Sequence, residues 1–450
     1  MQLPDQLIDS LQGTRGFNKD AFEKIHSSRQ QITSIRINQS KPVTQLTNKP
    51  INQLTKIPWT EYGYYLDTRP SFTFDPLFHA GCYYVQEASS MFLEQALKQT
   101  IDIAAPLRVL DLCAAPGGKS THIQSLLSKD SLLVSNDVIR SRGSILKDNI
   151  IKWGSENVIV TNNDPKDFAR LENYFDVIVV DVPCSGSGLF RRQPEAIDEW
   201  SKKNVQLCSQ RQQRILADVW PALKKDGILI YSTCSYSKEE DEDIVNWLMQ
   251  ELQIDNCQLS IANDWGIIES SGGYRFWPDK VQGEGFFIAS FRKKDGDDFF
   301  GFKSVSKPVL FGKKELEKVK EWLVPCDNQF IRRENTIYAL PAVLLNDISF
   351  LSASLHVIYP GIETGEWIRD KMIPAHALAM SGLVSKKLQM VNLDLDTAVN
   401  FLKKKNIHID PVNKGWNLVT YKGCNLGWVN VLSNRVNNYY PKSLRILKDN

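Results

Sequence analysis

Two short cysteine-containing segments hold the residue types best suited to chemistry. They read Asp181-Val182-Pro183-Cys184-Ser185-Gly186 and Ser232-Thr233-Cys234-Ser235-Tyr236. Each segment follows an apolar run typical of a buried strand, so in a parallel sheet both would lie at the same edge. A thiolate can bond covalently to a substrate, and a nearby carboxyl group can donate or share a proton. We therefore predict Cys184, Cys234 and Asp181 as catalytic residues.

The remaining cysteines show no pattern that indicates a ligand site. The chain has 8 cysteines, without a C-x-x-C pair or a dense cluster, which argues against a disulfide framework and a zinc ribbon. We expect no metal and a reducing, cytoplasmic environment. Free cysteines are often buried as small hydrophobic residues. We interpret the others in this way: Cys82, Cys208, Cys257, Cys326 and Cys424, with Cys113 packing within a turn.

A small-residue turn between an expected strand and an expected helix indicates a cofactor site. The turn reads Cys113-Ala114-Ala115-Pro116-Gly117-Gly118-Lys119-Ser120. Small residues let a ligand approach the backbone, and amides at a helix terminus face it. The turn matches neither G-x-G-x-x-G nor the phosphate loop G-x-x-x-x-G-K-[ST]. A small ligand without a bound phosphate fits better.

Acidic residues at the ends of the following strands support a nucleoside-type cofactor. Asp137 ends the second strand, at a distance along the chain from the glycine turn that suits contact with ribose hydroxyls. Asp164 follows the third strand and is a candidate for the adenine amine, and Asp181 ends the fourth. A single aspartate of this kind is more often a turn or helix-capping residue, but the ordered set favours a cofactor. NAD remains an alternative, disfavoured by the missing G-x-G-x-x-G.

The elements that must position these residues alternate between strand and helix. We expect apolar strands at 108–112, 132–135, 158–161, 175–181 and 227–232, a late strand at 285–292, and an earlier one at 34–38. Between them lie amphipathic stretches at 119–127, 140–153 and 204–223. This alternation is typical of a doubly wound α/β sheet. The charged segment 293–298 is predicted to be a linker before a mixed region of about 150 residues.

Composition limits the function classes only broadly. The chain has 450 residues, 42% hydrophobic and 24% charged, as in ordinary globular proteins. No apolar run approaches the roughly 18 residues needed to cross a bilayer, and residues 1–16 do not resemble a signal peptide. Net charge is +2, with the positive excess in the last third of the chain. This excess fits a nucleic-acid partner, although a solvated lysine-rich surface is an equally good interpretation.

Together, the motifs CAAPGGKS, DVPCSGSG and YSTCSY resemble those of the Nop2/Sun group of RNA 5-methylcytosine methyltransferases. The resemblance is strong over residues 80–292 and implies S-adenosylmethionine as the cofactor, held by residues 113–119 with Asp137, Asp164 and Asp181. It also implies that Cys234 is the nucleophile and that Cys184 assists product release. DNA cytosine methyltransferases use the Pro-Cys cysteine as nucleophile, so the presence of both cysteines favours RNA.

Looser matches in the flanks resemble a bacterial branch of this group that acts on 16S ribosomal RNA of the small subunit. They include GEGFF at 283–287 and a tail with GWV at 427–429. They imply four parts. These are an α+β N-terminal region (1–104), a Rossmann-like methyltransferase core with a mostly parallel seven-stranded sheet (105–294), an α+β region (299–394) and a PUA-like RNA-binding domain (395–450).

The expected partner is RNA, reached by a base that is unpaired or flipped from its stack. Arg191 and Arg192, directly after the Pro-Cys segment, are predicted to contact phosphate. Lys202, Lys203, Arg211 and Arg214 could extend that surface or form an ordinary solvated helix face. We expect no membrane partner and a monomer. A tRNA or DNA cytosine methyltransferase and a catalytically silent rRNA-binding assembly factor are the alternatives.

Overall fold

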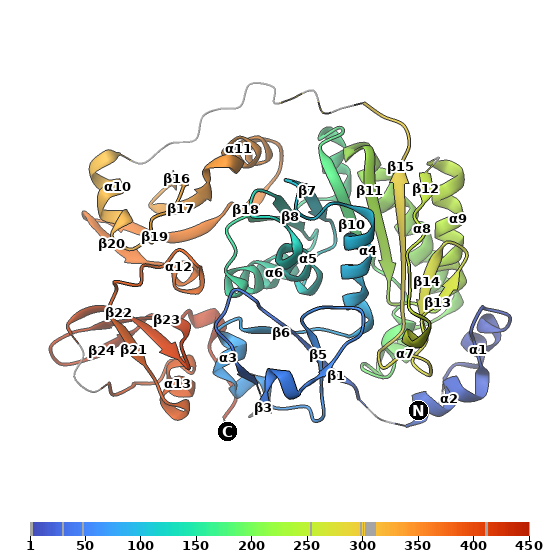
Figure 1. Ribbon diagram of the computed structural model, residues 1–450, viewed down its shortest axis with the longest axis horizontal. Coiled ribbons are helices and arrows are strands. Elements are labelled where there is room, and N and C mark those ends of the chain that lie inside the picture. Colours follow the sequence, from blue (N-terminus) through green and yellow to red (C-terminus); the bar gives the residue numbers. More distant parts are fainter. Residues whose placement is uncertain are drawn as a thin grey trace.

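The structure is a computed structural model that describes residues 3–28, 31–46, 49–252, 254–297, 299, 301, 312–409 and 413–449. Within these residues the strands form five β-sheets, of which the largest lies at the centre of the molecule (Figure 1). The last residue of the predicted linker, Asp298, lies outside the described residues.

The central sheet has ten strands in the described part of the chain. Their bounds are β7 (Arg108–Asp111), β8 (Leu132–Asn136), β9 (Val158–Thr161), β10 (Phe175–Asp181), β11 (Leu223–Thr233), β12 (Ile254–Asn256), β13 (Ile268–Ser270), β14 (Gly273–Phe276), β15 (Phe286–Lys293) and β18 (Val357–Tyr359). Nine follow the order β13-β14-β15-β11-β10-β7-β8-β9-β18, and β12 pairs with β15. The five strands from β11 to β9 are parallel, and the strands beyond them at each edge are antiparallel.

Alternation of side chains along the strands divides the core into two faces. In β10, Val177 faces one hydrophobic cluster and its neighbour Ile178 faces the other. One face is covered by α4 (Leu93–Thr100), α5 (Gly118–Leu126) and α6 (Arg140–Trp153), and the opposite face by α8 (Lys202–Val219), α9 (Glu242–Glu251) and α11 (Leu345–Ser354). Helices on both faces of a mostly parallel sheet confirm the predicted Rossmann-like, doubly wound fold.

The predicted elements of the core agree closely with the observed ones. The strands at 158–161 and 175–181 and the helix at 140–153 have the bounds expected from the sequence. The predicted helix at 204–223 is displaced, since α8 begins at Lys202 and ends at Val219. Pro221 follows in the next turn, where its ring cannot continue an α-helix.

A strand and a helix from beyond residue 294 pack with the core. The sequence did not indicate this arrangement. Strand β18 pairs antiparallel with β9 at the sheet edge, and α11 packs on one face through Ile348 and Leu351. The seven strands from β9 to β14 correspond to the predicted core, and β18, β13 and β12 extend it to ten. The four-part division of the chain remains a prediction.

The N-terminal region contains two helices that pack on the core, a four-stranded sheet and a two-stranded sheet formed by β2 and β3. Its elements are α1 (Asp5–Leu11), α2 (Lys19–Ser27), β1 (Thr33–Ile37), β2 (Gln45–Leu46), β3 (Lys49–Pro50), β4 (Thr55–Lys56), β5 (Gly63–Leu66), α3 (Pro76–His79) and β6 (Tyr83–Val85). Helices α1 and α2 pack against Tyr236 and Trp277 of the core. The sheet, of order β4-β5-β1-β6, shares a hydrophobic cluster with the last part of the chain.

The C-terminal region forms two further four-stranded sheets (Figure 1). The first, of order β16-β17-β19-β20, comprises β16 (Asn328–Arg333), β17 (Thr336–Pro341), β19 (Ile362–Ile368) and β20 (Lys371–Pro374), with α10 (Lys313–Lys320) and α12 (His376–Met380) beside it. The second comprises β21 (Met390–Asn392), β22 (Gly415–Tyr421), β23 (Cys424–Val431) and β24 (Val436–Asn438), with α13 (Leu395–Leu402).

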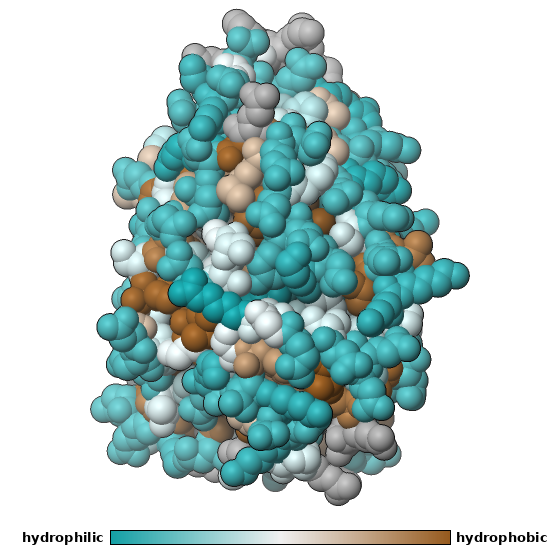
Figure 2. All heavy atoms as spheres, turned by 90° about the vertical axis from the view of Figure 1, so that its right-hand side faces the viewer, coloured by the Kyte–Doolittle hydropathy of each residue, from teal (hydrophilic) through white to brown (hydrophobic). Residues whose placement is uncertain are grey.

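The face of the molecule that carries α1, α9, β13 and β14 is mainly hydrophilic, and its hydrophobic side chains occur in separate small groups (Figure 2). Among the helices of the described residues, none combines the length and the apolar character that crossing a membrane requires.

Candidate active site

The predicted site residues gather at the carboxyl ends of the five parallel strands. Strand β7 leads into the small-residue turn, β8 ends before Asp137, β10 ends at Asp181, and β11 ends immediately before Cys234. Strands β10 and β11 are paired neighbours, with Asp181 opposite Ser232. This edge is where ligands bind in open α/β sheets, and the register brings both cysteine segments to it.

Hydrogen bonds with two neighbouring segments fix the turn after β7 in place. The backbone N–H of Ala114 donates to the Asn136 carbonyl (2.7 Å), and Arg142 Nη2 donates to the Ala115 carbonyl (2.8 Å). Gly117 has φ +113°, a left-handed conformation that a side chain would strain. The turn then passes directly into α5, so that the first amides of the helix face the same edge of the sheet.

Three carboxylates follow or end strands at this edge of the sheet, including one that sequence reasoning missed. Asp137 is buried, and its carboxylate accepts from the Ile139 N–H (2.9 Å), while Asp164 caps a short helical turn through the Lys166 N–H (3.2 Å). The third, Asp111, ends β7 and accepts from Ser120 Oγ (2.7 Å). Burial raises the pKa of Asp111 to about 7.

Exposed apolar side chains lie next to these carboxylates and were also missed. Val138 and Ile139 directly follow Asp137 and are 54% and 48% exposed. Two adjacent exposed aliphatic residues at the end of a buried strand are unusual for a solvated loop. They offer a flat apolar ligand group a place to pack. A sequence signal existed, since both are β-branched residues immediately after a strand-end acid.

The two cysteines that the sequence placed on separate strands are in contact. Their sulfur atoms lie 3.0 Å apart, and both residues are partly accessible. The hydrogen bond with Cys234, together with burial, raises the pKa of Cys184 well above its ordinary value. Cys184 therefore remains a thiol that can donate its hydrogen towards the sulfur of Cys234.

Lys119 joins the turn after β7 to the carboxyl end of β10. Its ammonium group lies 2.9 Å from Asp181 Oδ2, while Asp181 Oδ1 accepts from Ser232 Oγ (2.7 Å). Burial acts to lower the pKa of Lys119, but the Asp181 carboxylate outweighs it and raises that pKa, with Cys234 contributing to the rise. The sequence pointed to Lys119 only as part of the turn, because nothing local relates it to Asp181.

The two arginines after the Pro-Cys segment have different environments. Arg192 is exposed, as expected of a phosphate contact. Arg191 is buried, its Nη1 donates to the Gly283 carbonyl (3.1 Å), and the same nitrogen lies 3.6 Å from Glu284. The expectation of a surface phosphate contact at Arg191 therefore disagrees with its placement, because its guanidinium joins two buried segments.

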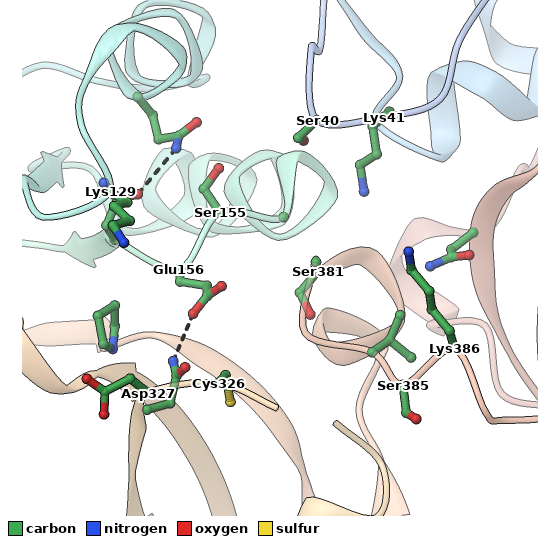
Figure 3. Close-up of a pocket in the computed structure, with 18 of the residues that line it drawn as sticks. Ser40, Lys41, Lys129, Ser155, Glu156, Cys326, Asp327, Ser381, Ser385 and Lys386 are labelled. Carbon is green, nitrogen blue, oxygen red and sulfur yellow. Dashed lines mark hydrogen bonds between the residues drawn. The ribbon is translucent and has the colours of Figure 1, made fainter. Parts of the chain in front are cut away.

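A cavity of about 870 Å³ lies elsewhere in the molecule, and neither Cys184 nor Cys234 lines it (Figure 3). It lies between the core and the C-terminal sheets. None of the predicted site residues lines it. Its lining includes three positive and three negative side chains, which are Lys41, Lys129, Lys386, Asp130, Glu156 and Asp327. Across the cavity, Asn328 Nδ2 donates a hydrogen bond to Glu156 Oε2 (2.8 Å). The paired thiols and the Lys119–Asp181 ion pair make the strand-end site the better candidate for catalysis.

Two of the solved structures to which the chain is similar come from Pyrococcus horikoshii. A methyltransferase homologue protein from Pyrococcus horikoshii is 29% identical, with a TM-score of 0.51, over 65% of this chain and all (100%) of that one. NSun6 from Pyrococcus horikoshii has a TM-score of 0.55 at 20% identity, over 66% of this chain and 99% of that one. The second likeness shows the fold alone.

Relatives of similar length come from several bacteria. "Ribosomal RNA small subunit methyltransferase F" of Pectobacterium atrosepticum is 28% identical over 98% of this chain and 96% of the relative. The protein of that name from Aeromonas salmonicida is 28% identical over 100% and 98%. The one from Shewanella loihica is 27% identical over 91% and 88%.

Family models match three separate parts of the chain. Residues 99–292 match the 16S rRNA methyltransferase RsmB/F family. Residues 3–88 match the N-terminal domain of 16S rRNA methyltransferase RsmF, and residues 389–446 match the methyltransferase RsmF PUA domain. The chain is therefore similar to 16S rRNA methyltransferases of the RsmB/F family in its core and to RsmF in the matched parts on either side.

Proposed function

We propose that this protein transfers a methyl group from S-adenosylmethionine to carbon 5 of a cytosine in small-subunit ribosomal RNA, through a transient covalent bond between the base and Cys234. The observation that carries the proposal is the pair of sulfur atoms 3.0 Å apart, beside the Lys119–Asp181 ion pair. Carbon 5 of cytosine is a poor nucleophile, and addition of a thiolate at carbon 6 is the chemistry that activates it.

The residues around the turn after β7 fit the proposed cofactor. Asp137 would accept hydrogen bonds from the ribose, Asp164 from the adenine amine, and the exposed Val138 and Ile139 would pack on the purine. The small residues 113–118 would let the ligand approach the backbone amides. When bound, S-adenosylmethionine supplies an electrophilic methyl group on a sulfonium.

The chain's own groups divide the chemistry between them. Cys234 forms the bond to carbon 6, which shifts electron density towards carbon 5 and ring nitrogen 3. Lys119 and Asp181 lie together at the strand end, where they would share a proton with that nitrogen and so meet the developing charge. Carbon 5 would then take the methyl group as the methyl–sulfonium bond breaks and leaves a neutral thioether, and carbon 5 would carry both a methyl and a hydrogen.

The reaction closes when the hydrogen on carbon 5 leaves as a proton. The electron pair of that bond re-forms the ring double bond, and the carbon 6–sulfur bond breaks to return Cys234. Cys184 touches the departing sulfur and holds a thiol hydrogen. It is therefore placed to assist elimination, either by donating to the Cys234 sulfur or by ordering a water that accepts the carbon 5 proton.

RNA binding would use an exposed surface near the strand-end site. The target base must be flipped or unpaired to reach the sulfur atoms. We propose Arg192 as a phosphate contact, since it is exposed, and do not retain Arg191 in this role. The part that matches a PUA domain model would bind the same RNA at a distance from the site. Cytoplasmic location and a monomeric state stay predictions.

The direct test incubates the protein with S-adenosylmethionine labelled in its methyl group and with small-subunit rRNA, assembled small subunits, tRNA or DNA. We expect label in cytosine of the rRNA or the subunit, found as 5-methylcytidine after nuclease digestion. Label in tRNA or DNA alone would change the substrate class. Binding of rRNA without incorporation into any substrate would indicate an assembly factor instead.

A further inference from the structure

Glu240 joins the two cysteine segments. It ends the helical turn η7 (Lys238–Glu240) and is fully buried. Its Oε1 accepts from the Ser185 backbone N–H (2.7 Å), and its Oε2 accepts from both Ser185 Oγ (2.6 Å) and Ser235 Oγ (2.6 Å). Each serine directly follows one of the two cysteines, so a single carboxylate spans both segments.

The contacts of Glu240 continue into the scaffold. Gln212 of α8 donates to Glu240 Oε1 (3.4 Å) and to the Pro183 carbonyl (3.2 Å), and its own carbonyl accepts from the Tyr231 hydroxyl (2.9 Å). The Tyr231 hydroxyl also lies within hydrogen-bond distance of the Glu240 backbone carbonyl, and its single hydrogen can be donated to one of these two acceptors at a time. The carboxylate is therefore fixed by a helix and by β11, both of which are packed in the core.

A buried carboxylate is unfavourable unless its oxygens are satisfied. Burial raises the pKa of Glu240, and the hydrogen bonds from Ser185 and Ser235 oppose that rise. Among the described residues, no hydrogen bond joins Glu240 to either sulfur. The contacts of Glu240 with the two cysteine segments are therefore made through the serines and the backbone, and its charge also helps to raise the pKa of Cys184 through space.

We infer that Glu240 is a positioning residue that holds the Cys184 and Cys234 segments together, so that their sulfur atoms stay 3.0 Å apart. The geometric part stands on these contacts, and its consequence for turnover rests on the proposed function. A second contact, from the Gly188 N–H to the Cys234 carbonyl (2.9 Å), ties the same segments further along. The hydroxyls of Ser185 and Ser235 also lie 3.4 Å apart, and the carboxylate of Glu240 accepts a hydrogen bond from both of them.

Three substitutions of Glu240 distinguish the effect of its hydrogen bonds from the effects of its negative charge and of its side-chain length. Glu240→Gln keeps one acceptor for the Ser185 N–H, and its amide can donate to the serine hydroxyls, which can also accept. Glu240→Asp keeps the charge but shortens the side chain by one methylene, so that it cannot span both serines. Glu240→Ala removes the link. Glu239→Ala is the matched control, because Glu239 is the exposed neighbour.

The first readout needs neither RNA nor methyl donor. A short bis-electrophile that bridges neighbouring thiols is added to the folded protein, and the Cys184–Cys234 bridge is quantified by peptide mass spectrometry. We expect wild type, Glu239→Ala and Glu240→Gln to bridge within about twofold of one another, and Glu240→Ala and Glu240→Asp to bridge at least ~10-fold more slowly. Thermal unfolding shows that each variant is folded.

The second readout is methyl transfer. We expect Glu240→Ala to lower kcat by ~100-fold with KM values for RNA and methyl donor within about threefold, and Glu240→Gln to restore kcat. Bridging by Glu240→Ala at the wild-type rate would overturn the inference, and so would a Glu240→Gln variant as defective as Glu240→Ala. If bridging behaves as expected but wild type transfers no methyl group, the proposed function fails and the positioning role stands.

Discussion

The ammonium group of Lys119 lies 2.9 Å from Asp181 Oδ2, at the end of the strand that leads to Cys184. The ion pair connects the turn after β7 with the cysteine segments, and its side chains are 14% (Lys119) and 35% (Asp181) exposed to water. Charge interactions are stronger in such a setting than at an open surface. It gives the proposed site a proton-sharing group beside the nucleophile.

Removing the charge of Lys119 should impair chemistry more than binding. We expect Lys119→Met to lower the single-turnover rate of methyl transfer by ~10²- to 10⁴-fold, because the ammonium group that would share a proton with ring nitrogen 3 is removed. Binding of rRNA, measured by filter retention, should change little. Lys129→Met, at an exposed lysine of the same core, serves as the control. A wild-type rate in Lys119→Met would rule out this role.

The two cysteines should have opposite mutant phenotypes. Cys184→Ala should accumulate a covalent protein–RNA adduct, because elimination of Cys234 would be slowed after the carbon 6 bond has formed. Cys234→Ala should be inactive and form no adduct. Denaturing gel electrophoresis of protein with labelled RNA distinguishes the two. Normal product release by Cys184→Ala, combined with methylation by Cys234→Ala, would show that the roles are assigned wrongly.

Substitution of Arg191 should reduce the stability of the fold, whereas substitution of Arg192 should weaken RNA binding. Arg191→Ala leaves Glu284 buried without its partner, so we expect the free energy of unfolding to fall by roughly 3 kcal/mol. Arg192→Ala should leave unfolding unchanged, raise KM for RNA ~3- to 10-fold and reduce the slope of log affinity against log salt by about one. Equal effects of both changes on RNA affinity, without loss of stability, would restore Arg191 as an RNA contact.

Buried histidines should make the fold sensitive to mild acid. Burial lowers the pKa of His26, His79 and His122 to about 4 and that of His376 to about 3. The unfolded chain binds these protons near pH 6.5 and the folded chain does not. Stability is therefore full above about pH 6.5 and is lost as pH falls towards 4, by up to ~1.4 kcal/mol per pH unit for each histidine.

Urea unfolding at several pH values between about 7 and 5 measures this dependence. His376→Gln should reduce the slope of unfolding free energy against pH by about one proton, because it removes one of the four groups. His356→Gln, at an exposed histidine, should leave the slope unchanged. A flat profile for wild type would contradict the expectation.

The sequence was sufficient for the central strands and the strand-end acids. Continuous apolar runs such as Phe175–Asp181 identify buried parallel strands, and the residue after such a run falls at a known edge of the sheet. The same local logic placed Asp137 and the two cysteine segments at that edge. These features depend on neighbouring residues in the chain, and so a pattern reveals them.

Contacts between distant segments needed the tertiary structure. The pairing of β18 with β9, the Lys119–Asp181 ion pair and the carboxylate of Glu240 between Ser185 and Ser235 each join residues that no periodicity relates. Burial of Arg191 likewise depends on Gly283 and Glu284, which arrive from a later strand connection. The sequence determined which groups stand at the carboxyl edge of the parallel strands. Only the folded chain decided which of them touch, because strand register and packing set those distances.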